Sequence, residues 1–181
     1  MKTDVPLGLV ETETRLSIPV AVVLERTIDR SKKWPFPSWR IYAIVADDNI
    51  SEDYQQVILP GGEDVHRSFH SGLKLELFKD GSEGYWYNLL SGEPFLFVVC
   101  DGEQGDMEIE PFYVTANQDE ATGYLESDDI VLSAPMPADV RDLLERYVVS
   151  HYHPEIKKKR KRKDWLEDSL YADSKSKNEQ G

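Results

Sequence analysis

The residues with the most distinctive chemistry form a run of seven cations near the end of the sequence. The run consists of Lys157, Lys158, Lys159, Arg160, Lys161, Arg162 and Lys163. If the cations contact phosphates, nucleic-acid affinity should fall with salt at a log–log slope of about −0.9 per contact. They would equally suit an acidic protein surface, or a solubilising tail that folds back onto an acidic body. Nucleic acid, protein and the chain itself all remain open as targets.

The segment that follows the cations, DWLEDSLY, has the apolar spacing of a short amphipathic helix. Trp165, Leu166 and Leu170 would share one side of about one and a half helical turns. A basic run followed by a short apolar helix is typical of a docking peptide that becomes ordered on binding. We therefore expect the cations and these three apolar residues to contact a partner.

Three consecutive aromatic residues, Tyr85, Trp86 and Tyr87, form a second candidate site. In a strand, Tyr85 and Tyr87 would share one face and Trp86 would lie on the other. Such a strand would pack one face on a core. The alternative is a stacking surface for a base or a partner side chain, although no basic residue interleaves with the aromatics.

The segment WPFPSW places Trp34, Phe36 and Trp39 within six residues. Large aromatic side chains are usually buried, so we expect this loop to fold back and cap the sheet. The alternative is a protein-binding loop that exposes a hydrophobic anchor. Pro35 and Pro37 should keep the segment extended and outside any strand ladder.

The histidines and the single cysteine do not predict a metal or catalytic site. His66 and His70 are four residues apart, and His151 and His153 are two apart, with no third ligand at a recognisable spacing. Cys100 ends an apolar strand and is expected to be a buried, inert thiol. The sequence has no phosphate-binding P-loop, no G-x-S-x-G and no H-E-x-x-H motif. We expect no catalytic residue, no metal and no cofactor.

Charge divides the sequence into an acidic body and a partly cationic tail. The 181 residues carry a net charge of −13 from 34 acidic and 21 basic residues. Up to Ser150, 28 acids and 12 bases give −16; from His151 onward, 6 acids and 9 bases give +3. The body should repel nucleic acid and anionic membranes, so any phosphate contact would come through the tail. One cysteine, no signal-peptide pattern and no membrane-length apolar run favour a cytoplasmic location.

Short strands and one strong helix must position these residues. Apolar and alternating runs predict strands at residues 18–26, 39–46, 55–60, 73–79, 84–90, 95–100, 107–116 and 128–133. Turns at Asp80-Gly81 and Ser91-Gly92 would join three of them into a meander that contains the aromatic run. Asn117 and Glu120 have the spacing of a helix N-cap box, which predicts a short helix over Gln118 to Leu125.

The segment PMPADVRDLLERYVVSHYH predicts the C-terminal amphipathic helix. Its apolar stripe consists of Val140, Leu143, Leu144, Tyr147 and Val148. The predicted fold class is α+β: a mainly antiparallel curved sheet or partly open barrel of about seven strands, with this helix over one opening. A two-sheet sandwich is the alternative. We expect a flexible acidic arm at 1–16, one domain at 17–153 and a disordered tail with the basic run at 154–181.

Three segments resemble a known family. They are ELFKDGSEGYWYNLLSGEPFLFVV, IPVAVVLER with the later W..WR, and MPADVRDLLERYVVSHYHPEIKKKRKR. Together they are similar to a bacterial family, domain of unknown function 3305, over roughly Ile18 to Lys163. The family's genes typically lie beside those of molybdenum-dependent formate dehydrogenases. The resemblance implies an accessory role in assembling, maturing or regulating such an enzyme.

Three functional hypotheses follow. The first is a non-catalytic accessory protein that binds a formate dehydrogenase subunit or a maturation factor. The second is a nucleic-acid-binding module that acts through the basic tail. The third is a small-molecule or molybdenum-cofactor-handling protein, centred on Tyr85, Trp86, His66 and His70. Family members are sometimes labelled molybdenum-cofactor nucleotidyltransferases, but the first strand here lacks the glycine-rich loop that such an enzyme needs.

Overall fold

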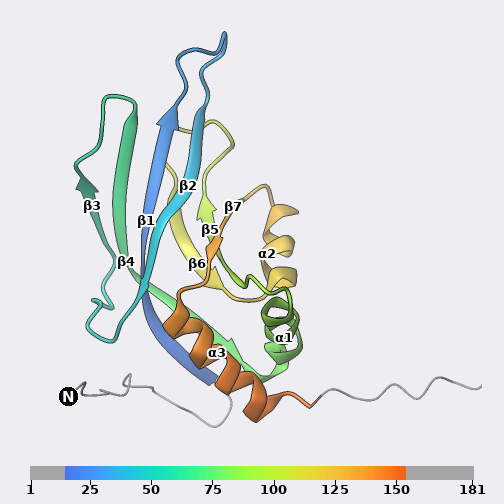
Figure 1. Cartoon of the computed structure of the whole chain (residues 1–181). Coiled ribbons are helices and arrows are strands. Elements are labelled where there is room, and N and C mark those ends of the chain that lie inside the picture. The colour runs from blue at the N-terminus through green and yellow to red at the C-terminus, as the bar shows by residue number, and fades with distance from the viewer. Residues whose placement is uncertain (1–14, 154–181) are drawn as a thin grey trace, which may run out of the picture.

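A computed structural model describes residues 15–153 of the chain, which form one sheet-rich domain with three α-helices (Figure 1). The strands are β1 (Arg15–Ile28), β2 (Pro37–Ala46), β3 (Gln55–Leu59), β4 (Val65–Phe78), β5 (Phe95–Asp101), β6 (Glu110–Thr115) and β7 (Ile130–Pro135). The helices are α1 (Ser82–Leu90), α2 (Gln118–Leu125) and α3 (Ala138–His151), and a 3-10 turn, η1 (Lys79–Gly81), precedes α1.

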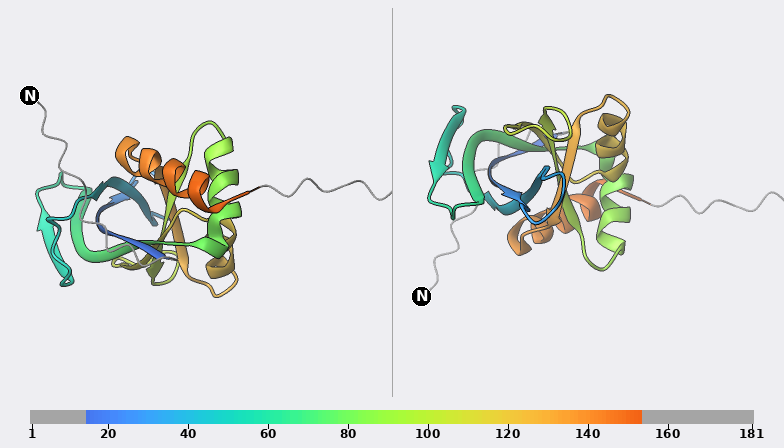
Figure 2. Two further views of the ribbon diagram at one scale, coloured as in Figure 1. Left: turned by 90° about the horizontal axis from the view of Figure 1, so that it is seen from below. Right: turned by 90° about the horizontal axis from the view of Figure 1, so that it is seen from above.

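The seven strands form one sheet in the order β2-β1-β4-β6-β5-β7, and β3 joins β4 off this path. The sheet curls until its outer strands β2 and β7 approach each other, which makes a nearly closed barrel (Figure 2). The expected curved sheet is confirmed, but a mainly antiparallel sheet is wrong in one place. β6 runs parallel to β4, with Leu75 opposite Val114, so the sheet is mixed.

Strand β4 changes neighbours halfway along its length, and this makes room for β3. β1 pairs with β4 along nearly its whole length, while the other edge of β4 pairs first with β3 and then with β6. The change occurs at Gly72, whose φ is +80°. A Cβ there would lie 2.5 Å from the backbone nitrogen of Tyr54. Only glycine fits this left-handed position so close to another backbone.

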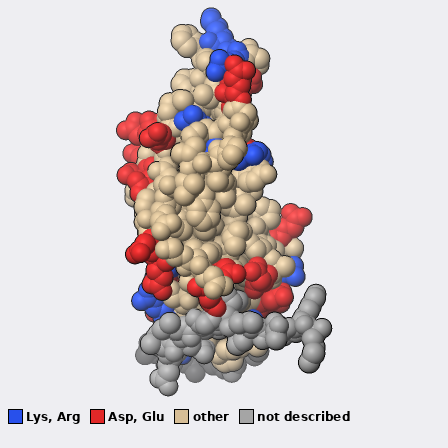
Figure 3. Space-filling view, turned by 90° about the vertical axis from the view of Figure 1, so that its left-hand side faces the viewer, with Lys and Arg blue, Asp and Glu red and all other residues tan. Residues whose placement is uncertain are grey.

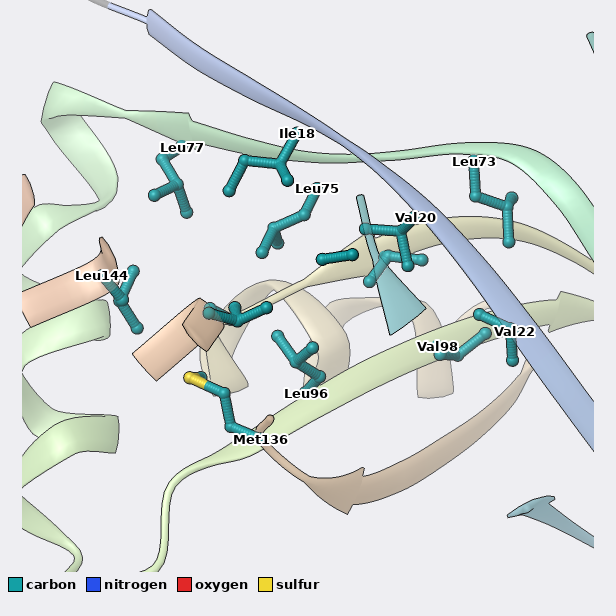
Figure 4. Close-up of a cluster of buried hydrophobic side chains, with 14 of the residues drawn as sticks. Ile18, Val20, Val22, Leu73, Leu75, Leu77, Leu96, Val98, Met136 and Leu144 are labelled. Atoms are coloured by element: carbon teal, nitrogen blue, oxygen red, sulfur yellow. The ribbon is translucent and has the colours of Figure 1, made fainter. Parts of the chain in front are cut away.

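The core fills the barrel and continues under α3 (Figure 4). Inward side chains of β1 and β4, including Ile18, Val22 and Leu75, are almost wholly buried. The predicted stripe of the C-terminal helix is confirmed: Val140, Leu143, Leu144, Tyr147 and Val148 are all buried. Removing this much apolar surface from water is the main source of the domain's stability.

Helix α1 lies where the sequence predicted the middle strand of a meander, so that strand and the meander are wrong. Ser82 and Tyr85 are buried, and Leu89 packs on the core, while Tyr87 is exposed. This is the period of a helix rather than the alternation of a strand. The Asn88 amide fixes the helix by donating to the carbonyls of Phe95 and Ala116, each at 2.7 Å.

Two further elements follow the predictions closely. Helix α2 occupies the predicted residues, and the Asn117 carboxamide oxygen accepts from the backbone N–H of Asp119 at 3.0 Å. Strand β2 is antiparallel to β1 as expected. However, Pro37 is its first residue and lies opposite Ile28, so the prediction that this proline stays outside any ladder is wrong. Proline is tolerated there because it begins an outer strand.

Candidate functional site

The loop between β1 and β2 projects beyond the barrel as a basic hairpin with exposed aromatic side chains (Figure 1). We call residues 26–40 the basic-aromatic hairpin. Trp34 and Phe36 are each 70% exposed, so the expectation that WPFPSW folds back as a cap is wrong for both. Trp39 differs because it packs against the core and its Nε1 donates to the carbonyl of Asp106 at 3.0 Å. Trp34 and Phe36 are therefore largely exposed on a hairpin whose base is anchored, with the Phe36 ring near Gly105.

Local hydrogen bonds shape the tip. The Asp29 carboxylate accepts from the hydroxyl and the backbone N–H of Ser31, at 2.6 and 3.1 Å. These two bonds lower the pKa of Asp29, with Lys32 adding a smaller effect. Asp29 thus stays ionised at neutral pH and forms a turn of the kind that aspartate favours. The turn presents the next residues, Lys32 to Phe36, to solvent.

The charge of the hairpin opposes that of the body. Residues 26–40 contain five basic residues and one acidic residue. Arg30 is 2.6 Å from the Asp64 carboxylate, and Arg26 lies over the Trp39 ring and donates to the carbonyl of Met107. The ammonium groups of Lys32 and Lys33 are exposed. Figure 3 shows lysine and arginine at this end of the molecule, with acidic side chains directly beside them.

A buried carboxylate fixes the strands that carry the hairpin. Glu25 on β1 is 2% exposed, and its carboxylate accepts hydrogen bonds from the Nε atoms of Arg40 and Arg67, each at 2.6 Å. Desolvation alone would raise the pKa of Glu25, but the hydrogen bonds and charges of the two arginines outweigh it and lower the pKa. Arg67 also lies over the Tyr42 ring, 4.1 Å from its centroid. This network joins β2, β1 and β4 at the base of the hairpin.

An open cleft of about 800 Å³ lies beside the hairpin's base, between the first residues of β2 and strand β7. Trp39, Gly105, Leu125 and Ile130 line it together with acidic residues that include Asp128. The cleft thus adds an open surface with apolar and acidic groups next to the base of the hairpin. Such a region suits a protein partner better than a small molecule, which is usually enclosed on most sides.

The aromatic run is divided among three environments rather than two strand faces. Tyr85 is wholly buried; its hydroxyl accepts the backbone N–H of Phe78 at 3.2 Å, and burial raises its pKa to about 12. Trp86 is partly buried and its ring lies 5.3 Å from that of Tyr152. Tyr87 is exposed. The run therefore belongs mainly to the packing between α1 and α3.

His70 and Cys100 lie in structural surroundings. His70 is wholly buried, and its two ring nitrogens are hydrogen-bonded to the hydroxyls of Tyr54 and Ser68, at 3.1 and 2.8 Å. Burial lowers the pKa of His70, opposed by the charge of Glu110. Burial raises the pKa of the Cys100 thiol to about 12. Within residues 15–153, no three histidine, cysteine or acidic side chains are placed to hold a metal ion.

A second cleft, of about 610 Å³, lies between α1, α2 and the start of β5. Tyr87, Asn88 and Asn117 line it together with the carboxylates of Glu93 and Asp119. The Asn88 amide is already committed to the backbone. His70 lies on β4 and is hydrogen-bonded to Tyr54 and Ser68. It therefore does not join Tyr85 and Trp86 in one site, as the small-molecule hypothesis expected.

The basic run and the apolar segment after it lie outside the described residues. These are Lys157, Lys158, Lys159, Arg160, Lys161, Arg162, Lys163, Trp165, Leu166 and Leu170. Lys32 and Lys33, which directly precede the exposed aromatic residues, were not among the predicted site residues. The signal was available in the run SKKWPF, where two cations directly precede the aromatic residues.

Comparison with known proteins gives a family and nothing more specific. The family model described as a protein of unknown function, DUF3305, matches residues 19–162. The chain belongs to this family. Neither curated proteins nor solved structures gave a match. Among the helices of residues 15–153, none is long and apolar enough to cross a membrane.

Proposed function

We propose that this protein is a non-catalytic accessory protein that acts by protein–protein interaction through the basic-aromatic hairpin. The observation that carries the proposal is the 70% exposure of both Trp34 and Phe36 beside Lys32 and Lys33. Neither ring belongs to the hydrophobic core or to the side chains packed against it. Tryptophan and other large aromatic side chains are the usual anchors of protein interfaces, where truncation of one costs about 2 kcal/mol or more.

The charges of the hairpin define the surface that it should bind. Its cations favour a partner with an acidic surface around an apolar pocket. The negative charge over the rest of this protein would repel the same surface, so the partner would be steered to the hairpin. The resemblance to a family encoded beside formate dehydrogenase genes supports a formate dehydrogenase subunit or a maturation factor as this partner.

We propose the basic run from Lys157 to Lys163 and the apolar residues Trp165, Leu166 and Leu170 as a second contact. Helix α3, after which this segment follows, lies at the opposite end of the domain from the hairpin (Figure 1). We propose that the hairpin and this segment contact separate parts of one acidic partner. Their combined affinity would then exceed that of either contact alone.

Affinity capture from cells that produce a formate dehydrogenase tests the proposal. The full-length tagged protein is compared with the double variant Trp34→Ala, Phe36→Ala, and with Tyr87→Ala as a control of similar exposure on α1. Loss of two anchors should reduce the affinity for the partner by at least about tenfold, since every 1.4 kcal/mol is a factor of ten. Tyr87→Ala should leave it unchanged. Equal capture by all three proteins, or capture of no formate dehydrogenase component, would contradict the proposal.

Nucleic-acid binding is the second candidate function, because cations beside exposed aromatic rings also suit single-stranded nucleic acid. In that case binding of RNA or DNA would weaken steeply with salt. It would also be lost when Lys157 to Lys163 are changed to alanine. We place this function second because the acidic body repels phosphates. A cofactor-handling role ranks third, since carboxylates line both clefts described above and would repel the phosphate of a molybdenum cofactor.

A further inference from the structure

Strand β3 combines an uncharged sequence with an exposed position in this highly charged protein. Nine consecutive residues from Tyr54 to Gly62, YQQVILPGG, carry no charge, although 30% of the whole chain is charged. Val57 is 48% exposed and Ile58 is 58% exposed. Because successive residues of a strand point to opposite faces, both faces of β3 present apolar side chains to solvent. The strand therefore contributes little to the core.

The position of β3 leaves one of its backbone edges available. In the part of the chain that the structure describes, β3 pairs with β4 alone. Both views of Figure 2 show it standing away from the closed part of the barrel. The face of the molecule on this side is a broad surface with few charged side chains, bordered by acidic and basic groups (Figure 3). An exposed strand edge at such a surface can add a strand from another chain.

The sequence of β3 lacks the devices that usually prevent this pairing. Edge strands are commonly protected by lysine or another charged residue, by a bulge, or by proline within the strand. Gln55–Leu59 has none of these, and Pro60 comes only after its last residue. The strand is thus built so that another strand can approach it.

We propose that β3 pairs with β3 of a second copy of this chain, antiparallel about a twofold axis at Val57. Two copies with a net charge of −13 each repel one another over most of their surfaces. The uncharged face around β3 is where that repulsion is weakest. A twofold axis brings the same edge of each copy together, so the backbone groups on the outer edge of one strand meet their complements on the other, while the remaining groups stay bonded to β4.

The predicted dimer is small and exchanges with the monomer. Its contact is a five-residue strand with flanking apolar side chains. Interfaces below about 1,200 Å² are typical of weak or transient complexes. Salt should strengthen the dimer, because it screens the repulsion between the acidic bodies while leaving backbone hydrogen bonds intact. This inference does not depend on the function proposed for the hairpin.

Disulfide trapping tests the symmetric arrangement. In a twofold antiparallel pair the two Val57 side chains lie opposite each other, with Cβ atoms about 5 Å apart, which is near the reach of a disulfide. The full-length Val57→Cys variant should form a covalent dimer under mild oxidation. Val149→Cys is the control, because Val149 is 77% exposed but lies on α3. The native Cys100 is buried and contributes no background. Equal trapping of both variants, or none of Val57→Cys, would overturn the twofold pairing.

Sedimentation velocity over a range of concentrations tests the dimer without a cross-link. The native chain should show a dimer that increases with concentration and with salt. Val57→Lys should abolish it, whereas Val149→Lys should leave it unchanged, and circular dichroism confirms that both variants are folded. A native chain that stays monomeric at every concentration and salt level overturns the proposal. A dimer that survives Val57→Lys does the same.

Discussion

Replacing Tyr85 and Tyr87 separately by alanine should have very different effects on stability, although the two residues are nearly adjacent. In a strand they would share a face and respond alike. In helix α1, Tyr85 is wholly buried and packs edge-on against Tyr147, with ring centroids 6.4 Å apart. Tyr87 is 58% exposed, and its hydroxyl makes only a long contact of 3.5 Å with Glu83. The two substitutions therefore distinguish a helix from a strand.

The expected magnitudes follow from burial. Tyr85→Ala should lower the free energy of unfolding by about 3–5 kcal/mol, as for other buried aromatic residues cut to alanine. Tyr87→Ala should change it by less than about 0.5 kcal/mol. Tyr85→Phe isolates the hydroxyl: it leaves the backbone N–H of Phe78 without its 3.2 Å acceptor, at a cost of about 1–2 kcal/mol.

Urea unfolding at pH 7, followed by tryptophan fluorescence, measures these differences in free energy. Thermal scans should agree, with a midpoint about 10 °C lower for Tyr85→Ala, at roughly 3 °C per kcal/mol for a chain of this size. Similar losses for Tyr85→Ala and Tyr87→Ala would refute the helical assignment. So would a larger loss for Tyr87→Ala than for Tyr85→Ala.

Two further predictions concern single residues of the sheet. Glu25→Gln should lower the free energy of unfolding by about 1–2 kcal/mol at pH 7, after allowance for the solvent around its arginine partners. Because the pKa of Glu25 is lowered in the folded protein, this contribution is present above the ordinary glutamate pKa and is lost as pH falls through the lowered value. A difference in the free energy of unfolding between Glu25→Gln and the native chain that stays constant down to acidic pH would contradict this. Gly72→Ala should destabilise by at least about 2 kcal/mol, because its φ is +80° and the added Cβ meets the Tyr54 backbone. Gly123→Ala in α2, where a Cβ meets nothing within 4 Å, should stabilise the domain by up to about 1 kcal/mol. Denaturant unfolding measures both glycine variants, and a stabilised Gly72→Ala or a destabilised Gly123→Ala would contradict these predictions.

Local patterns in the sequence were sufficient where burial follows a simple period. The stripe from Val140 to Val148 fixed α3, and the alternation of Leu73, Leu75 and Leu77 fixed the second half of β4. Asn117 identified the start of α2 because its side chain can replace a missing backbone partner at a helix N-terminus. These signals lie within one element, so they can be read without knowledge of its neighbours.

The errors arose where contacts distant in sequence decide the outcome. Tyr85, Trp86 and Tyr87 have high strand propensity, but packing of Tyr85 and Leu89 on the core stabilises a helix instead. The parallel pairing of β6 with β4 joins residues such as Leu75 and Val114, whose distance apart in sequence hides the contact. Both cases are tertiary effects that override local preference.

The candidate interaction surfaces were predicted less well than the fold, for a related reason. Apolar residues are normally assigned to the interior, and this assignment failed for Trp34 and Phe36 at the hairpin tip. Val57 and Ile58 lie in a run of normal strand composition, and only the position of β3 beyond β4 leaves them exposed. Exposure of a hydrophobic side chain depends on what the rest of the chain leaves uncovered.

Site-specific photo-crosslinking tests most directly whether the hairpin is the docking element. A photoreactive benzoylphenylalanine replaces Phe36 in one protein and Tyr87 in another, and each is irradiated in cells that produce a formate dehydrogenase. Position 36 should yield a covalent adduct containing a formate dehydrogenase subunit or maturation factor, while position 87 should yield none. An adduct of that partner from position 87 with none from position 36 would contradict this prediction, as would the absence of any such adduct from both positions.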